Sequence, residues 1–144
     1  MPATQSFDNH ARYQPFYHFL ASPVAYGIVL VAIWTLWKEP TWGNVIDATV
    51  AFGLAAAVVM SRVMAVTVQN RVIRLEMRLR LKEILPAELQ PRIRDLSVRQ
   101  LIALRFAGDG EMAGLVERTL KGEFAKPRDI KRAITDWQPD YLRC

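Results

Sequence analysis

The side chains that could do cofactor or redox chemistry are few. His10 and His18 lie in the aromatic N-terminal stretch FDNHARYQPFYHFL, and the only cysteine is Cys144. Either histidine could ligate a haem or chlorophyll at a membrane interface, although such residues more often serve as hydrogen-bonding groups there. Residues 69–144 contain no histidine, so a zinc site cannot be assembled in them, and a single cysteine allows no disulfide within the chain. We therefore predict no bound cofactor and no metal ion.

The acidic residues do not form a recognisable catalytic pattern. Asp109 and Glu111 lie in AGDGEMAG, which lacks the twelve-residue pattern of a calcium loop. The same stretch lacks the glycine spacing and the preceding strand of a phosphate-binding loop. Elsewhere in residues 69–144, Asp and Glu alternate with Lys and Arg, as on a solvated helix surface. The sequence therefore predicts no catalytic residue and a protein that is not an enzyme.

Charge is divided unequally between the two parts of the sequence. Residues 1–61 contain two basic and three acidic side chains, whereas residues 62–144 contain 17 basic and 11 acidic ones. An apolar, nearly uncharged part followed by a basic one is typical of a membrane anchor joined to a polar domain. The basic charge begins next to the apolar part and carries no recognition motif, so we expect anionic lipid headgroups rather than nucleic acid as its partner.

Two segments of the sequence are apolar enough to be membrane spans. Residues 19–37 contain no charge, and their length is close to the roughly 20 residues that cross a bilayer core. A signal peptide fits poorly, because no Lys or Arg cluster precedes this segment and Trp34 and Trp37 close it. The second span covers residues 45–68, with Asp47 near one end and Arg62 towards the other. We expect a transmembrane hairpin over residues 19–68, preceded by an interfacial segment over residues 1–18.

The second span has two features that could contact a partner inside the membrane. Arg62 either extends to the headgroups or faces a partner, and its place near the end of the span favours the headgroups. Small residues recur at every fourth position, where another backbone could approach closely. This small-residue stripe packs either on the first span or on a helix of another protein, and it consists of Thr49, Gly53, Ala57, Ser61 and Ala65.

The positive-inside rule predicts the orientation of the two spans. The connector over residues 38–44 carries only Lys38, whereas residues 62–82 carry six basic side chains. Both termini are therefore expected in the cytoplasm. The basic residues expected near lipid headgroups are Arg62, Arg71, Arg74 and Arg78.

Residues 69–85, ending in RVIRLEMRLRLKEIL, alternate like a β-strand but are predicted to be helical. Their composition favours a helix, and no Gly or Pro separates them from the second span before Pro86. On a helix the apolar residues form two stripes on nearly opposite sides, where a surface helix normally has one. The inner stripe consists of Ile73, Met77, Leu81 and Ile84, and the outer stripe of Val72, Leu75 and Leu79. Either the chain's own C-terminal helices cover both, or one of them contacts a second protein or the lipid interface.

Short, well-delimited helices are predicted after Pro86. Ser97 and Gln100 form a capping box, Asp109 is a possible N-cap, Gly122 a C-cap and Pro127 a first helical residue. The expected fold is therefore all-α. It consists of a transmembrane helical hairpin, a second span extended into a long cytoplasmic helix, and a small C-terminal helical bundle, with residues 69–144 forming a basic cytoplasmic domain.

Four stretches of the sequence resemble a family of small bacterial membrane proteins classed as a domain of unknown function. They are NHARYQPFYHF, VQNRVIRLEMRLRL, VRQLIALRFAGDGEM and IKRAITDWQPDYLR. The resemblance covers the whole chain and implies a two-span protein of the bacterial inner membrane. It implies no activity, so no catalytic residue follows from it.

Two functional hypotheses follow. In the first, the protein is a non-catalytic accessory subunit of a larger membrane complex, respiratory or photosynthetic, whose other subunits contact its transmembrane helices and cytoplasmic domain. In the second, it is a membrane-tethered adaptor or regulator that binds anionic lipid or a transient cytoplasmic partner through its basic surface.

Overall fold

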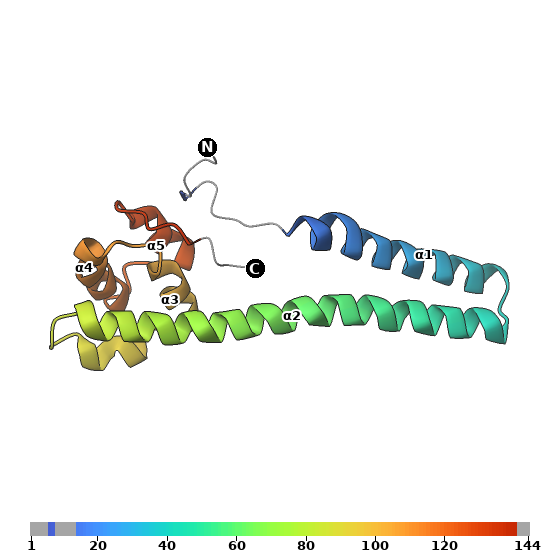
Figure 1. Cartoon of the computed structure of the whole chain (residues 1–144), viewed down its shortest axis with the longest axis horizontal. Coiled ribbons are helices and arrows are strands. Elements are labelled where there is room, and N and C mark those ends of the chain that lie inside the picture. The colour runs from blue at the N-terminus through green and yellow to red at the C-terminus, as the bar shows by residue number, and fades with distance from the viewer. Residues whose placement is uncertain (1–5, 8–13, 141–144) are drawn as a thin grey trace. The chain divides into compact units, whose positions relative to one another are not determined.

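The computed structural model describes residues 6–7 and 14–140, and the elements in this part of the chain are helical (Figure 1). The chain divides into two compact units, which we call the hairpin unit (residues 13–67) and the C-terminal unit (chiefly residues 68–143). The expected all-α fold is confirmed. In chain order the elements are η1 (Phe16–Ala21, a π-helix), α1 (Ser22–Lys38), α2 (Trp42–Ile84), η2 (Gln90–Asp95, a 3₁₀-helix), α3 (Val98–Leu104), α4 (Asp109–Leu120) and α5 (Pro127–Ala133).

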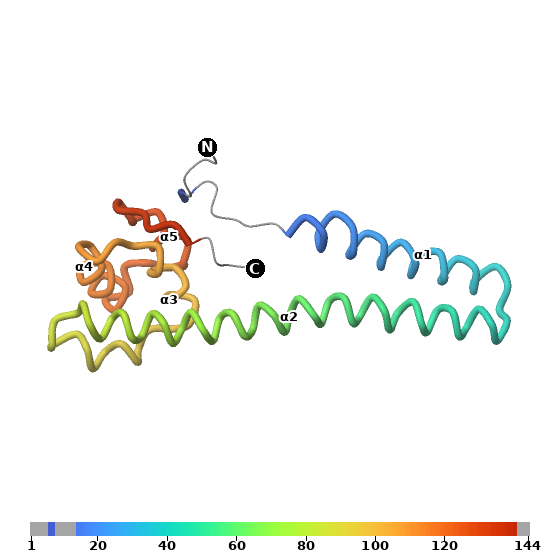
Figure 2. Tube along the Cα trace, in the orientation of Figure 1, coloured from blue at the N-terminus to red at the C-terminus, as the bar shows by residue number. Residues whose placement is uncertain are grey.

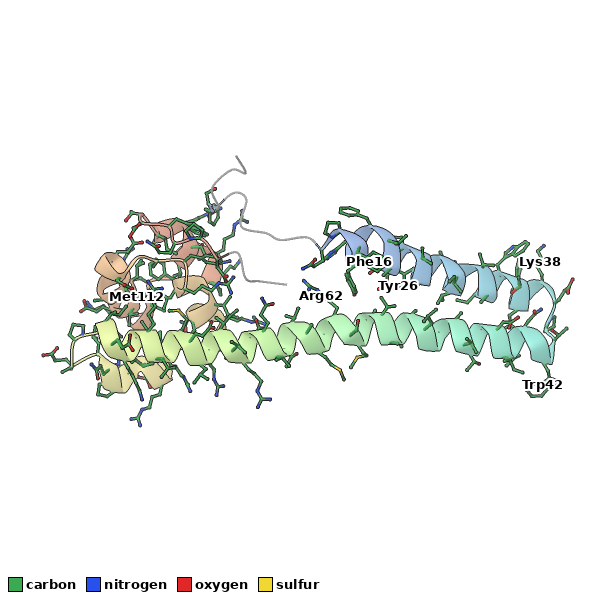
Figure 3. The ribbon with its side chains drawn as sticks, viewed as in Figure 1. Phe16, Tyr26, Lys38, Trp42, Arg62 and Met112 are labelled. Carbon is green, nitrogen blue, oxygen red and sulfur yellow. The ribbon has the colours of Figure 1, made fainter. Side chains whose placement is uncertain are left out.

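The hairpin unit contains η1, α1 and the first part of α2. Lys38 and Trp42 lie on either side of the turn that joins α1 to α2 (Figure 3). In this turn the Asn44 amide donates to the Glu39 carbonyl at 2.6 Å, and the Asn44 N–H donates to Thr41 Oγ1 at 3.2 Å. These bonds provide partners for backbone groups that the two helix ends would otherwise leave unpaired.

Among the described residues, two helices are long and apolar enough to cross a membrane, Tyr17–Lys38 and Trp42–Ile84. Only 11% of each apolar window is buried inside the protein, whereas the core helix of a soluble protein is mostly buried. Large apolar side chains such as Trp37 and Trp42 are 76% and 84% exposed. The helical turns begin at Phe16, directly after Pro15, earlier than the expected start at residue 19.

The C-terminal unit packs three short helices, α3, α4 and α5, beside the second part of α2 (Figure 2). Its largest fully buried side chains include Phe106, Leu81, Leu101 and Met112. α2 therefore contributes one side of the core, and the short helices contribute the other. This arrangement lets a small bundle bury more apolar surface than its own helices could bury alone.

The signals predicted for the helix ends are mostly confirmed. Ser97 and Gln100 form the expected capping box, with the Gln100 N–H donating to Ser97 Oγ at 3.3 Å. Gly122 follows α4 with a φ of 77°, a conformation that favours glycine, and Pro127 begins α5. The prediction of Asp109 as an N-cap is wrong. Gly108 occupies the N-cap, and Asp109 is the first helical residue, with its carboxylate bound to Arg80.

Candidate functional site on the long helix

The two apolar stripes of α2 have different surroundings in the C-terminal unit. In the inner stripe, Ile73, Met77 and Leu81 are at most 6% exposed and belong to the core, and Ile84 packs against it. In the outer stripe, Val72, Leu75 and Leu79 are 48%, 60% and 54% exposed. The alternative in which the chain's own helices cover both stripes is therefore wrong. Because the inner stripe is buried within the chain, the expected partner contact is reduced to the outer stripe.

Charged residues border the outer stripe on both sides. Arg71 and Arg74 are exposed on one side, and Glu76 and Glu83 are exposed on the other. Arg78 is half-buried, and its Nε is buried without a hydrogen-bond partner among the described residues. An apolar stripe between basic and acidic rows resembles the apolar centre and polar rim of a protein interface more than it resembles an ordinary solvated helix surface.

The small-residue stripe of the hairpin unit is also exposed. All five of its residues lie on the surface of α2, and the buried residues of this unit are instead Ala25, Ala32, Ala51 and Ala55. Ala51 follows Thr49 by two residues, which is about 200° around a helix, so the two face opposite ways. The stripe therefore does not pack on α1. The hydroxyl of Thr49 donates to the Val45 carbonyl at 2.8 Å, so the exposed surface presents no unpaired hydroxyl there.

Arg62 and His18 have partners inside the hairpin unit. The Arg62 guanidinium lies 5.8 Å from the centre of the Tyr17 ring, within the range of a cation–π interaction. His18 Nδ1 lies 2.9 Å from the Gln14 carbonyl oxygen, and the His18 ring packs edge-on against Tyr17. Arg62 lies near the start of the first helix, where Phe16 is also found (Figure 3). Through these contacts, Arg62 and His18 help to organise that start.

Two segments far apart in the sequence meet in the C-terminal unit, RFAGDGEM (residues 105–112) and ITDWQPD (residues 134–140). The rings of Phe106 and Trp137 stack with their centres 4.6 Å apart, and Arg105 Nε lies 3.1 Å from Asp140 Oδ2. The Gly108 N–H donates to the Asp136 carbonyl at 2.9 Å. The two segments lie within two of the four stretches on which the family resemblance rests. Their contacts indicate that the shared motifs maintain the fold of the bundle.

A family model described as a family of unknown function, DUF6526, matches residues 1–144. The chain belongs to DUF6526. Neither a curated protein nor a solved structure is significantly similar to it. The expected membership of a family of unknown function is confirmed, and a functional assignment for this DUF6526 chain has to come from its own surfaces.

Sequence reasoning on the DUF6526 chain missed the role of Arg80, because it treated the alternating charged residues of residues 69–144 together as a solvated helix surface. Arg80 Nε donates to Asp109 Oδ1 at 2.9 Å, and its terminal nitrogens donate to the carbonyls of Ala107 and Arg105 at 2.7 Å and 3.3 Å. This side chain thus connects α2 to the end of α3 and the start of α4. Arg80 lies between Glu76 and Glu83, four positions before it and three after it on the same helix. These local surroundings give no sign of a contact with residues near 107.

Glu111 is the other polar residue with an unexpected role. Its carboxylate accepts hydrogen bonds from the Thr135 hydroxyl at 2.6 Å and from the N–H groups of Thr135 and Asp136 at 3.0 Å and 3.1 Å. Burial alone would raise the pKa of Glu111, but these hydrogen bonds and the backbone of Gly108 together lower it. Glu111 therefore holds the segment after α5 against the start of α4, and it does so as a carboxylate.

The described residues contain no group of three or more His, Cys, Asp and Glu side chains that could hold a metal ion. His10 and Cys144 lie outside the described residues. Within the described part of the chain, the surface with the chemistry of a binding site is the outer stripe with its charged borders.

Proposed function

We propose that this DUF6526 protein is a non-catalytic accessory subunit of a larger bacterial membrane protein complex, which can be respiratory or photosynthetic. Its two apolar helices lie in the inner membrane, and other subunits contact the small-residue stripe and the C-terminal unit. The observation that carries this proposal is the outer stripe, because three large apolar side chains about half exposed to water are costly unless a partner covers them.

The proposed orientation puts both termini in the cytoplasm. The connector over residues 38–44 contains Lys38 as its only basic side chain, whereas α2 after Ser61 contains six. Positive residues remain on the cytoplasmic side during insertion, which favours this direction. Arg71 and Arg74 are exposed, and they would lie where anionic headgroups can neutralise them.

The polar residues with resolved contacts support a structural rather than a catalytic role. Arg80, Arg105 and Glu111 each join segments that are far apart in the sequence, through the contacts described above. A side chain whose donors or acceptors are used in this way has few left for a substrate.

Purification of the tagged protein from its native membrane in a mild detergent, followed by mass spectrometry, tests this proposal. We expect other membrane subunits to co-purify in fixed ratio, and we expect Leu75→Glu to reduce their recovery. The matched control is Arg74→Glu, which also adds a negative charge to an exposed position of α2 but lies outside the outer stripe. Recovery of the chain without any other subunit would contradict the proposal.

The exposed pair Arg71 and Arg74 favours a second candidate function, a membrane-tethered adaptor or regulator that binds anionic lipid. This function predicts that anionic lipids co-purify with the full-length protein and are released as salt is raised. Replacing both residues with Gln should reduce the co-purified anionic lipid. An unchanged lipid content in that variant would contradict it.

A further inference from the structure

The outer stripe has the spacing of a coiled-coil seam. Val68, Val72, Leu75 and Leu79 are separated by four, three and four residues, and they are 60%, 48%, 60% and 54% exposed. In heptad terms Val72 and Leu79 occupy a positions, and Val68 and Leu75 occupy d positions. Val72 at a and Leu75 at d are the combination that favours two parallel strands, whereas Leu79 at a and Val68 at d carry no such preference. The same spacing continues towards the N-terminus in the sequence through Ala65 and Ser61.

The charged borders of the seam specify what covers it. The g positions are Arg71 and Arg78, and the e positions are Glu76 and Glu83. In a parallel pair of helices, each g residue faces the e residue five positions later on the other strand. Two copies of this chain therefore place Arg71 opposite Glu76 and Arg78 opposite Glu83, twice each because of the two-fold symmetry. All four of these contacts are attractive.

An antiparallel pair is disfavoured by the same charges. In that arrangement g residues face g residues and e residues face e residues, so arginine meets arginine and glutamate meets glutamate. The parallel arrangement also fits a membrane, because every copy of a chain inserts in the same direction and the two-fold axis must then lie along the membrane normal.

We propose that the outer stripe together with Val68 is the seam of a parallel, two-stranded coiled coil formed with a second copy of this chain. Lys82 follows at the next d position and ends the seam, because two apposed lysines repel each other. The bundle packs on the inner stripe, and Val68, Val72, Leu75 and Leu79 stay 48–60% exposed, so their surface is accessible to a second strand. None of the four bordering charged residues is engaged in a salt bridge identified within the described part of the chain.

Two heptads are too short to associate as free peptides. Here α2 is already ordered by the core of the C-terminal unit, so the pair does not have to supply the free energy of helix nucleation. Confinement of both copies to one membrane also raises their effective concentration. The inference rests on the proposed function in one respect, namely that the outer stripe is a protein interface. It goes further by identifying the partner as a second copy of this chain.

Cysteine crosslinking of the full-length protein tests the seam. In a Cys144→Ser background, Leu75→Cys puts a thiol at a d position, where the two copies of a parallel pair bring their Cα atoms within the roughly 7 Å that a disulfide requires. The matched control is Arg74→Cys, one residue earlier, exposed, and pointing away from the seam. With mild oxidation in membranes of a host without other subunits, we expect Leu75→Cys to form disulfide-linked dimers at least about tenfold faster than Arg74→Cys. Equal rates would overturn the proposal.

Charge reversal tests the register and direction of the seam. Glu76→Arg puts arginine opposite Arg71, and Arg71→Glu puts glutamate opposite Glu76, so each should slow crosslinking through Leu75→Cys. The two reversals together restore the attraction and should restore the rate. A double variant as slow as the single ones would overturn the parallel register.

The same crosslinking in the native membrane separates this inference from the proposed function. Crosslinking of Leu75→Cys to a different protein would overturn the homodimer while supporting a role in a complex. A homodimer that purifies without other subunits would support the seam and contradict the accessory-subunit proposal. Absence of any protein crosslink would overturn the seam and favour lipid as the cover of the outer stripe.

Discussion

The Arg80 guanidinium on α2 binds the Asp109 carboxylate at the start of α4 with two N–H donors, at 2.9 Å and 2.6 Å. The same side chain donates to the carbonyl of Ala107, between α3 and α4. One arginine thus satisfies backbone acceptors that the end of α3 leaves unpaired, and it neutralises a carboxylate beside them. This contact connects the long helix to the segment RFAGDGEM that contains Asp109.

Arg80→Ala should destabilise the C-terminal unit. Removal of the guanidinium leaves the carbonyls of Arg105 and Ala107 without this donor, a loss of about 1–3 kcal/mol. The control is Arg74→Ala, an exposed arginine on the same helix, which should change stability by no more than about 0.5 kcal/mol. The measurement is the free energy of opening from urea-dependent hydrogen exchange of the amides in α3 and α4, with the full-length protein in detergent. Equal effects of the two substitutions would show that the contacts of Arg80 do not stabilise the C-terminal unit.

Leu81 and Leu79 are two residues apart on α2 and differ in burial, at 0% and 54% exposed. Leu81→Ala should cost the C-terminal unit about 2–5 kcal/mol, because it leaves a cavity in a packed core. Leu79→Ala should change the stability of the same unit by less than about 1 kcal/mol, since it removes atoms already in contact with solvent. Hydrogen exchange in dilute detergent, where copies of the chain are separated, measures both. A larger effect at Leu79 than at Leu81 would mean that the two stripes have been assigned to the wrong sides.

Gly108 and Gly110 give a second matched pair. A Cβ on Gly108 would overlap the Asp136 carboxylate, whereas a Cβ on Gly110 would meet no atom within 4 Å. Gly108→Ala should therefore push the exposed Asp136 side chain aside and destabilise the contact between the two segments, by about 1 kcal/mol. Gly110→Ala lies in α4 and should stabilise it by up to about 1 kcal/mol, because the unfolded chain loses freedom. Thermal unfolding followed by near-ultraviolet circular dichroism of the stacked Phe106 and Trp137 reports on this contact. We expect Gly108→Ala to lower the melting temperature and Gly110→Ala to raise it.

The pKa of Glu111 predicts a pH dependence in the acid range. Hydrogen bonds from Thr135 and Asp136 lower this pKa, so the unfolded chain binds the proton more tightly than the folded one. The stabilisation is fully present at neutral pH and is lost as the pH falls below about 4.5, through the lowered pKa. Glu111→Gln should be less stable than the unsubstituted protein at pH 7, and the difference should shrink on acidification. A difference that grows towards low pH would contradict this sign.

The long helix illustrates how much the sequence alone determined. A run of good helix formers without Gly or Pro required α2 to continue past its apolar part to residue 84, next to Pro86, and the capping signals located α3 and α5. These features are local, because propensity and capping depend on residues within a few positions of one another. The same local pattern also identified both apolar stripes of α2.

Tertiary structure decided which stripe is buried and which is left for a partner. Leu79 and Leu81 have the same side chain, and only the packing of the bundle on one side of α2 distinguishes them. The roles of Arg80 and Glu111 likewise depend on residues 29 and 24 positions away in the sequence. Long-range contacts of this kind arise from the shape of the packed core, and no periodicity in a single sequence encodes them.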